Sequence, residues 1–453
     1  MGDALPDSAT GAVLVCGARF AGQAAARALL ARGARVVLTD RSRPAGVDTL
    51  IDAGATFAGP LDALPADIDL VVTSPGWPPN HPLFADAAAR GVEVVGELEF
   101  AWRLRGEPAA DWLVVTGTNG KTTTVRMLES ILRAGGRRAL AVGNVGVSII
   151  DAVVDAAPYD VLAVEASSYQ LYWSSTIRPT AGALLNLAPD HLDWHGSMAA
   201  YEQAKTAVWH GAVAVGNADD TRVAALLPVG GTGFTLAAPA AGQLGIVDGR
   251  LVSDAFGDDA LALVEAADVR PSGQHNVANA LAAAALARAY GIEATAIADG
   301  LRRFVPDPHR NEPVLTRDGV AWVDDSKATN PHAARASLTA YPRVVWVAGG
   351  QLKGVDVSDL VAEIAHRLAG AVLLGEDRAS VAAALARHAP EVPVITVDST
   401  DDGAMTEVVR AAAGLARPGD TVLLAPAAAS YDMFTDYAAR GDAFAAAARG
   451  LSS

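Results

Sequence analysis

Three stretches of the chain share one pattern, in which short apolar runs alternate with segments of helical periodicity. The runs of the first stretch are 13–20, 35–40, 70–76 and 92–97, the second stretch opens with 112–124, and the third contains 320–330, 343–350, 371–377, 392–398 and 421–430. These runs are nearly continuous in β-branched residues, as parallel strands that are buried on both faces require. The alternation predicts α/β layers with largely parallel sheets.

Two breaks separate these stretches and suggest domain boundaries. A Gly-Glu-Pro segment at 106–108 interrupts the first pattern, and a proline-rich segment at 305–313 precedes the third. A chain of 453 residues is also too long for one compact core. We therefore predict three domains, over residues 1–108, 109–307 and 308–453.

Composition and charge exclude several classes of protein. The 35 basic and 51 acidic residues give a net charge of -16, which argues against nucleic acid as a partner. No apolar run approaches the ~18 residues that a membrane-spanning helix needs, so we expect no membrane insertion. Asp3 and Asp7 lie where a signal peptide would be basic, and the single cysteine, Cys16, excludes an internal disulfide. We expect a cytoplasmic protein.

A glycine-rich loop follows the apolar run 113–116 and precedes the helical pattern 125–136. The loop consists of Gly117, Thr118, Asn119, Gly120, Lys121, Thr122 and Thr123. Backbone N–H groups at the start of a helix bind phosphate oxygens, Lys121 adds a positive charge, and the Thr122 hydroxyl can bind Mg²⁺. Val115 stands where the general phosphate-loop pattern has its first glycine. The sequence predicts a nucleotide site, with an ordinary strand-to-helix turn as the alternative.

Other polar residues lie at positions where chemistry is expected. Glu165 ends an apolar strand, where a carboxylate can hold Mg²⁺ or cap the next helix. His191 and His195 have the spacing of a zinc pair, but they lie in a loop without an HExxH pattern. Lys205 lies in a helical pattern, where a lysine is usually a solvated surface residue.

The first stretch carries half of a dinucleotide fingerprint. Gly17 and Gly22 lie between strand and helix, and Asp40 ends the next strand, but Arg19 replaces the middle glycine. This pattern leaves a nicotinamide-dependent oxidoreductase open as an alternative, although such an enzyme would not explain the phosphate loop.

Five motifs in chain order resemble those of the Mur ligase family, the ATP-dependent amide ligases of peptidoglycan synthesis. They are GTNGKTT at 117–123, ExSSxQL at 165–171, the Asp-His pair at 190–191, PHR at 308–310 and DSKATN at 325–330. The resemblance covers essentially the whole chain. It implies an N-terminal Rossmann-like sheet that binds UDP, a central P-loop ATPase-like sheet that binds ATP and magnesium, and a C-terminal Rossmann-like domain that binds an amino acid.

The resemblance also implies roles for individual residues. The expected catalytic residues are Lys121, Asn144, Glu165, His191 and Lys205. Two Mg²⁺ ions are expected, with Thr122, Glu165, His191 and a carbamylated Lys205 as ligands. Besides the loop, the residues expected to contact ATP are Asn276, Arg310 and Asp325. Those expected to contact the UDP substrate are Phe20, Ala21, Asp40, Arg41 and Asn144. Those expected to bind D-glutamate are Lys327, Thr329, Lys353, Ser430 and Tyr437.

The implied reaction joins D-glutamate to UDP-N-acetylmuramoyl-L-alanine through an acyl phosphate, at the expense of ATP, in a monomer. Two positions depart from the family pattern, because Asn311 and Tyr437 stand where phenylalanine is often found. Rival interpretations are a relative that adds another amino acid, a folate-specific relative, and a nucleotide-sugar-binding regulator with an inactive site.

Overall fold

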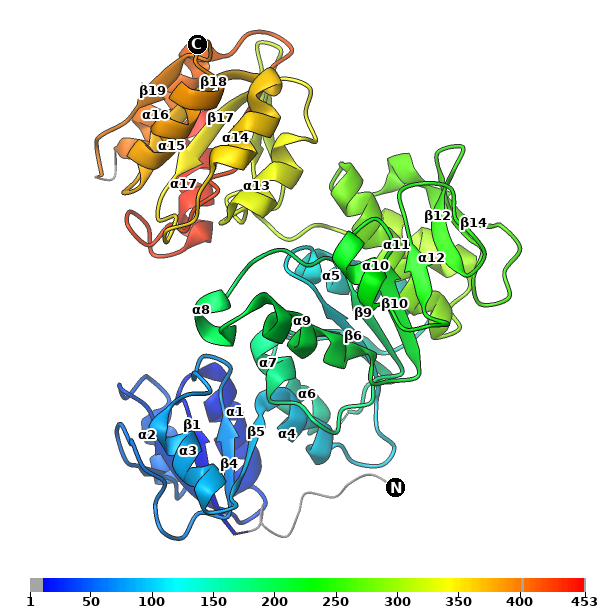
Figure 1. The fold of residues 1–453 in the computed structure, drawn as a ribbon, viewed down its shortest axis with the longest axis vertical. Coiled ribbons are helices and arrows are strands. Elements are labelled where there is room, and N and C mark those ends of the chain that lie inside the picture. The colour runs from blue at the N-terminus through cyan, green and yellow to red at the C-terminus, as the bar shows by residue number, and fades with distance from the viewer. Residues whose placement is uncertain (1–10, 156, 401–402, 452–453) are drawn as a thin grey trace. The chain divides into compact units, whose positions relative to one another are not determined.

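The computed structural model describes residues 11–155, 157–400 and 403–451, so that Asp3 and Asp7 lie outside the described part of the chain. The backbone divides into two compact units. The first contains Met1–Asp268 and Ala278–Phe304, and the second contains Val269–Val277 and Val305–Ser453. Figure 1 labels most of the helices and several of the strands of both.

The first unit begins with a five-stranded parallel sheet, in the order β3-β2-β1-β4-β5. Its strands are β1 (Ala12–Cys16), β2 (Arg35–Thr39), β3 (Thr56–Phe57), β4 (Leu70–Thr73) and β5 (Glu93–Gly96), and its helices are α1 (Phe20–Leu30), α2 (Val47–Asp52), α3 (Pro82–Ala89) and α4 (Glu97–Leu104). Helices α1, α2 and α4 pack on one face and α3 on the other. Cys16 is buried in β1, and burial raises the pKa of its thiol.

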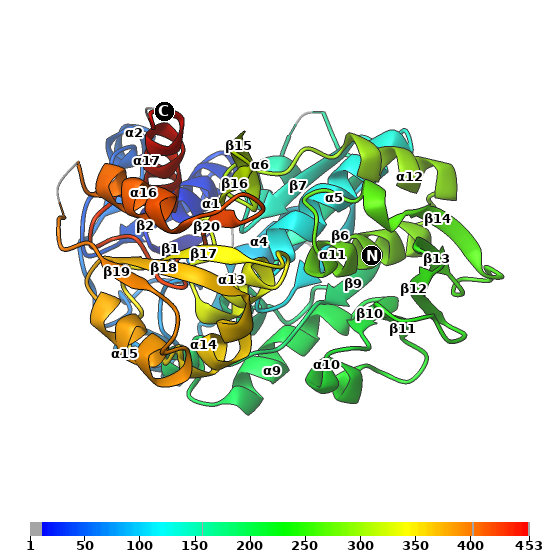
Figure 2. The ribbon, with the colours of Figure 1, turned by 90° about the horizontal axis from the view of Figure 1, so that it is seen from above.

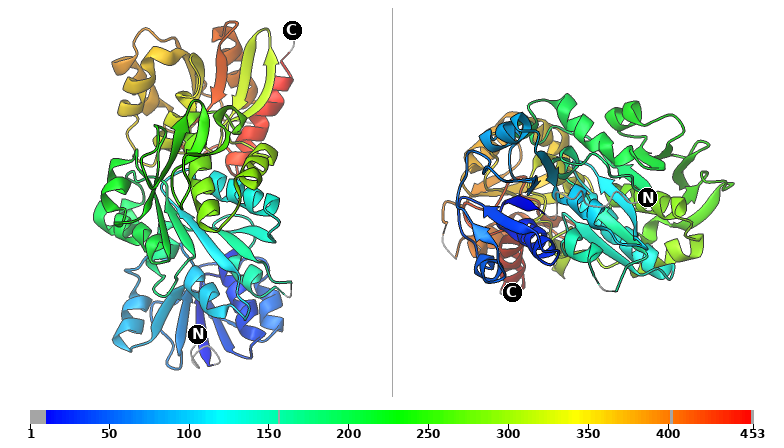
Figure 3. Two further views of the ribbon diagram at one scale, coloured as in Figure 1. Left: turned by 90° about the vertical axis from the view of Figure 1, so that its right-hand side faces the viewer. Right: turned by 90° about the horizontal axis from the view of Figure 1, so that it is seen from below.

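A second sheet in the same unit has nine strands, in the order β14-β13-β12-β11-β10-β9-β6-β8-β7. The strands are β6 (Asp111–Thr116), β7 (Ala139–Gly143), β8 (Val161–Glu165), β9 (Ala181–Leu184), β10 (Val213–Asn217), β11 (Thr232–Phe234), β12 (Gln243–Val247), β13 (Arg250–Ser253) and β14 (Leu261–Glu265). Among the strands that the structure describes here, β13 runs antiparallel to both of its neighbours, β12 and β14, and the other pairs are parallel. Strand β6 lies between β8 and β9. Figure 2 labels most of these strands in order, and Figure 3 shows the sheet from two further sides.

The helices of this part cover the sheet, and the loops that connect its strands to these helices lie at its carboxyl edge. They are α5 (Lys121–Ala134), α6 (Ile149–Val153), α7 (Ser168–Tyr172), α8 (Leu192–His195), α9 (Met198–Thr206), α10 (Thr221–Leu226), α11 (Gln274–Ala289) and α12 (Ala294–Arg303). Because β6 lies at the point where the strand order changes direction, the loop after β6 is placed where open α/β sheets bind ligands.

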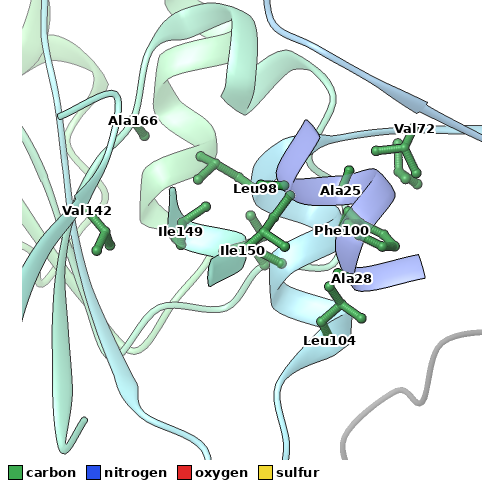
Figure 4. Close-up of a cluster of buried hydrophobic side chains, with 14 of the residues drawn as sticks. Ala25, Ala28, Val72, Leu98, Phe100, Leu104, Val142, Ile149, Ile150 and Ala166 are labelled. Carbon is green, nitrogen blue, oxygen red and sulfur yellow. The ribbon is translucent and has the colours of Figure 1, made fainter. Parts of the chain in front are cut away.

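One apolar cluster joins the two sheets of the first unit. Ile149 and Ile150 of α6 pack with Ala25 of α1 and with Leu98 and Phe100 of α4, as Figure 4 shows. These side chains are almost fully buried. The contact between the five-stranded sheet and α6 is therefore part of a continuous hydrophobic core.

The second unit is built on a six-stranded sheet, in the order β15-β16-β20-β17-β18-β19. Its elements are β15 (Glu312–Arg317), β16 (Val320–Asp324), α13 (Pro331–Leu338), β17 (Val344–Gly349), α14 (Ser358–Ile364), β18 (Leu368–Leu374), α15 (Arg378–His388), β19 (Val394–Thr396), α16 (Ala404–Leu415), β20 (Thr421–Leu424) and α17 (Tyr437–Arg449). Only β15 runs antiparallel to its neighbour. Helices α13, α14 and α15 cover one face, and α16 and α17 cover the other (Figure 2).

The predicted fold class, α/β with three mostly parallel sheets, is confirmed. The antiparallel pairings of β13 and β15 were not predicted, and the two domain boundaries, at 108 and 307, stay predictions. Among the helices that the structure describes, none combines the length and the apolar character needed to cross a membrane.

Candidate active site

The glycine-rich loop joins β6 to the 14-residue helix α5. Gly120 has a φ of 84°, and a Cβ there would lie 2.4 Å from Asn279 Oδ1, so a larger residue would be strained and would displace Asn279. The Lys121 ammonium donates to the carbonyls of Gly117 (3.0 Å) and Thr118 (2.9 Å). The loop therefore brings a cation and a helix N-terminus together, an arrangement that suits phosphate binding.

A residue that the sequence did not indicate braces this loop from β9. Asn186 accepts from Thr118 N–H through its carbonyl (3.0 Å), and its side chain both accepts from Asn119 N–H (2.8 Å) and donates to Asn119 O (3.0 Å). The Thr118 hydroxyl also lies 3.0 Å from the Tyr201 hydroxyl. Asn186 lies two residues after a strand, the position that could have drawn attention to it, but the pairing with Asn119 depends on the fold.

Glu165 and Asn144 lie beside the loop, at the ends of β8 and β7. Glu165 is 2% exposed, and its Oε1 accepts from Asn144 Nδ2 at 3.0 Å. Its other carboxylate oxygen, Oε2, is buried and has no hydrogen-bond partner among the described residues. An unpartnered buried carboxylate oxygen fits a hard cation. Thr122 and Thr123 lie in the first turn of α5. This helix comes after the loop that follows β6, and β6 is the neighbour of β8 in the sheet.

Lys205 reaches the same edge from the last turn of α9. The side chain is 2% exposed, and Nζ donates to Gly117 O at 2.8 Å and to Thr116 Oγ1 at 3.4 Å. Burial lowers the pKa of Lys205 well below its usual value, and the charge of Lys121 lowers this pKa further. The alternative of a solvated helix-surface lysine is therefore wrong.

The two histidines of the following loop have different partners. His191 starts α8 with a φ of 54°, and its Nε2 lies 3.5 Å from Asp190 Oδ2. His195 Nε2 lies 2.9 Å from the Ser168 hydroxyl, and the ring stacks on Tyr169 at 5.7 Å. Burial lowers the pKa of both histidines, that of His195 to about 4. The His191 ring also packs on Tyr169, at 4.8 Å, so both histidines contact the same aromatic side chain and differ in their polar partners.

The residues expected to contact UDP lie around the loop after β1. Asp40 Oδ2 accepts from Ala18 N–H at 2.8 Å and so fixes the loop. A Cβ on Gly22 would lie 1.7 Å from Gly17 O, which explains the second glycine of the pattern. Phe20 is 60% exposed and can offer a ring face to a base. The other predicted contacts, on the same edge, are Ala21 and Arg41.

A buried carboxyl, Glu97, connects this N-terminal sheet to the segments that carry Asn144 and Glu165. It accepts from Gln170 Nε2 (3.1 Å) and from the Ser148 hydroxyl (3.4 Å). Burial raises the pKa of Glu97 to about 7. The sequence did not indicate this link, because an acidic residue at the start of a helix is an ordinary pattern.

In the second unit, a buried arginine holds the strand ends that carry the predicted amino-acid site. Arg440 is 1% exposed and donates to Ser326 Oγ (2.9 Å), Ser326 O (2.9 Å) and Ala428 O (3.1 Å). Burial lowers the pKa of Arg440 to about 10. Beside this network, Lys327 Nζ lies 3.9 Å from the centre of the Tyr437 ring. The sequence did not single out Arg440, because an arginine in an alanine-rich helix resembles a surface residue.

The other predicted glutamate contacts follow the carboxyl ends of neighbouring parallel strands, so they share one edge of the sheet. Thr329 follows β16, Lys353 follows β17 and Ser430 follows β20. Ser430 is 2% exposed, whereas Lys353 is exposed and has a φ of 54°.

The three residues predicted to contact ATP outside the phosphate loop all belong to the second unit. Asn276 is 3% exposed and donates to Ser272 O at 3.3 Å. Asp325 accepts from the Ser337 hydroxyl, and burial raises the pKa of Asp325 to about 7. Arg310 Nε lies 4.0 Å from Asp307 Oδ2.

Comparison with known families and proteins gives full-length matches. Three family models match in order: "Mur ligase MurD-like, N-terminal domain" at 11–96, "Mur ligase middle domain" at 115–287 and "Mur ligase, glutamate ligase domain" at 309–428. Relatives from Thermobifida fusca and Streptomyces coelicolor are 55% and 53% identical, over 97% of this chain and 98% of each relative. A relative from Mycolicibacterium smegmatis is 49% identical, over 99% of this chain and 98% of its own. All three are named UDP-N-acetylmuramoylalanine--D-glutamate ligase.

Solved structures share the fold at lower identity. The UDP-N-acetylmuramate-alanine ligase MurC of Thermotoga maritima has a TM-score of 0.59 at 18% identity, and covers 96% of this chain and 98% of its own. A pseudomurein peptide ligase type C of Methanothermus fervidus has a TM-score of 0.56 at 22% identity, and covers 91% of this chain and 96% of its own. The resemblance that the motifs indicated is confirmed, and the chain belongs to the Mur ligase family.

Proposed function

We infer that this protein is an ATP-dependent ligase that joins D-glutamate to UDP-N-acetylmuramoyl-L-alanine in peptidoglycan precursor synthesis. The observation that carries this inference is the 55% identity, over 97% of the chain, with a relative named for that reaction. The loop, Glu165 and the strand ends of the second unit supply the chemistry that the reaction needs.

The reaction has two steps. An oxygen of the substrate carboxylate attacks the γ-phosphorus of ATP, the bond to the β-phosphate oxygen breaks, and an acyl phosphate and ADP form. The amine of D-glutamate then attacks the acyl carbon, and the tetrahedral intermediate expels phosphate to leave an amide. Both steps bring anions together, so the protein must offset their charge.

The phosphate loop binds and orients ATP in the first step. The N–H groups at the start of α5 face the phosphates, and the Lys121 ammonium exchanges its contacts with two loop carbonyls for a phosphate oxygen. Asn186 keeps the loop in shape during this exchange, because it holds both Thr118 and Asn119. Asn144 lies against Glu165, where it can orient the substrate carboxylate.

We propose two Mg²⁺ sites, one held by Thr122 and Glu165 and the other by His191 and a carbamylated Lys205. Bound Mg²⁺ would offset the charge between the γ-phosphate and the carboxylate. The buried, unpartnered Oε2 of Glu165 supports the first site.

The surroundings of Lys205 support carbamylation. A neutral amine adds CO₂ and releases a proton, and burial favours the neutral form of Lys205. A carbamate keeps one N–H, which can still donate to Gly117 O. A Lys205→Ala variant should lose activity and regain part of it with added short carboxylates, whereas full activity without added anions would contradict the carbamate.

The proposed glutamate site lies at the strand ends of the second unit. Lys327, Lys353, Thr329 and Ser430 are placed to bind the carboxylates of D-glutamate, with Lys327 packed on Tyr437. Arg440 donates hydrogen bonds to Ser326, the residue before Lys327, and so fixes this end of the strand. The domain boundaries at 108 and 307, a monomeric state and a cytoplasmic location belong to the same proposal.

The mass of the product tests this function. With ATP, UDP-N-acetylmuramoyl-L-alanine and D-glutamate, the protein should yield a UDP-sugar heavier by one glutamyl residue, and a Lys121→Ala variant should yield none. Binding of the UDP-sugar without any product would instead favour a nucleotide-sugar-binding regulator, and binding of a nicotinamide nucleotide would favour an oxidoreductase.

A further inference from the structure

Asn311 lies at the start of the second unit's sheet in an unusual backbone conformation. Its φ is 51°, in the left-handed region that asparagine and glycine tolerate better than bulky residues. The residue is 5% exposed and directly follows Arg310. A buried asparagine in this conformation needs partners for both its backbone and its amide.

Three separate segments provide those partners. The backbone N–H of Asn311 donates to Asp325 Oδ1 at 3.2 Å, beyond the end of β16. Its Nδ2 donates to Ser272 O at 3.3 Å, in the segment Val269–Val277. Its Oδ1 accepts from the Tyr341 hydroxyl at 2.7 Å, after α13. The backbone and side chain of one residue thus join three segments that are far apart in the sequence.

Two of these partners carry residues of the proposed nucleotide site. Ser272 O accepts a second hydrogen bond, from Asn276 Nδ2 at 3.3 Å, so Asn276 and Asn311 share one acceptor. Asp325 is 8% exposed and is held on its other oxygen by the Ser337 hydroxyl. Asn311 is therefore the common contact of the Asn276 segment and the Asp325 carboxyl.

We propose that Asn311 is a positioning residue for nucleotide binding. It keeps Asn276, Asp325 and the adjacent Arg310 in fixed positions relative to one another. This inference rests on the proposed function, because that function assigns those three residues to ATP. Without the amide, the Ser272 carbonyl loses its hydrogen bond from Asn311, and the segment that carries Asn276 is held less firmly against the sheet. The effect falls on nucleotide binding and leaves the amino-acid site intact.

Three variants separate positioning from general stability. Asn311→Gly keeps the left-handed conformation and removes the amide, whereas Tyr341→Phe removes only one hydrogen bond to it. Asp420→Asn is the matched control, since Asp420 is 3% exposed and pairs with Arg343 at 2.7 Å before β20, at the opposite end of the parallel strands from Asp325.

The measurements are the KM for ATP and for D-glutamate, kcat, and calorimetric binding of ADP and of tripolyphosphate. Asn311→Gly should raise the KM for ATP and the Kd of ADP about tenfold, the effect of losing one or two hydrogen bonds. Tyr341→Phe should give a smaller change in the same direction. Tripolyphosphate binding, the KM for D-glutamate and the Asp420→Asn control should stay within about twofold of wild type.

Two outcomes would overturn the inference. One is unchanged ADP binding in Asn311→Gly. The other is an equal loss of kcat in Asn311→Gly and Asp420→Asn with the KM for ATP unchanged, which would indicate a purely structural role. Failure of the proposed function would look different. A wild-type protein that binds ADP but forms no glutamyl product would refute the ligase assignment. The comparison of ADP binding between wild type and Asn311→Gly would still decide the role of Asn311.

Discussion

Replacing Glu97 by glutamine tests whether the buried link between the two sheets of the first unit holds a proton near neutral pH. The carboxyl is 5% exposed, and burial raises its pKa from 4.5 to about 7, against the opposing effect of hydrogen bonds from Gln170 and Ser148. The charge of Asp151 raises this pKa further. Glutamine has nearly the same shape, and its single carbonyl oxygen can accept from Gln170 Nε2 while its amide N–H faces the Ser148 hydroxyl, but it cannot ionise.

The pH dependence follows from these values. Between pH 4.5 and about pH 7 the folded protein keeps a proton that the unfolded chain has released. The free energy of unfolding therefore falls as the pH rises through this window, by up to about 1.4 kcal/mol per pH unit, or about 3 kcal/mol in all. Because glutamine cannot ionise, the Glu97→Gln variant does not undergo this fall in the free energy of unfolding. The difference in unfolding free energy between the variant and wild type therefore grows in favour of the variant as the pH rises, and it levels off above pH 7.

Urea unfolding, followed by tryptophan fluorescence at pH values from 5.5 to 8.5, measures the difference. Solubility sets the lower limit, because the charge of -16 shrinks in acid. About 2 kcal/mol of the expected difference remains within this range. Glu391→Gln, at an exposed position, is the matched control and should show no trend. A difference between Glu97→Gln and wild type that does not change with pH would show that Glu97 does not hold a proton in this range.

Three further predictions concern packing and substrate affinity. Gly441→Ala should lower the unfolding free energy by about 1–3 kcal/mol, because the Cβ of the new alanine would lie 2.2 Å from His309 Nδ1. An unchanged melting temperature would contradict this prediction. Arg440→Met should raise the KM for D-glutamate about tenfold but not that for ATP, and steady-state kinetics showing equal effects would argue against its proposed role. Asn186→Ala removes the acceptor for Asn119 N–H and should raise the KM for ATP severalfold. An unchanged KM would show that the phosphate loop keeps its conformation without Asn186.

Much of the fold could be predicted from the sequence because parallel strands that are buried on both faces have a distinct pattern. All six residues of β17 are buried, and its run of valines and tryptophan showed this directly. The strand β15 was missed because its residues are half-buried or exposed and its sequence begins within a proline-rich segment. An antiparallel edge strand of mixed polarity resembles a loop.

The candidate site could be predicted where a residue ends a strand, as Glu165 ends β8. The residues that hold the site were not, because their partners are distant in the sequence. Asn186 binds a loop 67 residues earlier, and Arg440 binds Ser326, 114 residues away. The helical pattern around Lys205 indicated a solvated lysine, and only the packing of α9 against the loop shows that it is buried.

Release of phosphate from ATP in the presence of UDP-N-acetylmuramoyl-L-alanine tests the proposed ligase activity directly. Parallel reactions contain D-glutamate, L-glutamate, glycine or a diamino acid. We expect phosphate release with D-glutamate alone, together with a product of matching mass. Release with another of these amino acids would contradict the assignment of the second unit's site, and no release with any of them would contradict the ligase function itself.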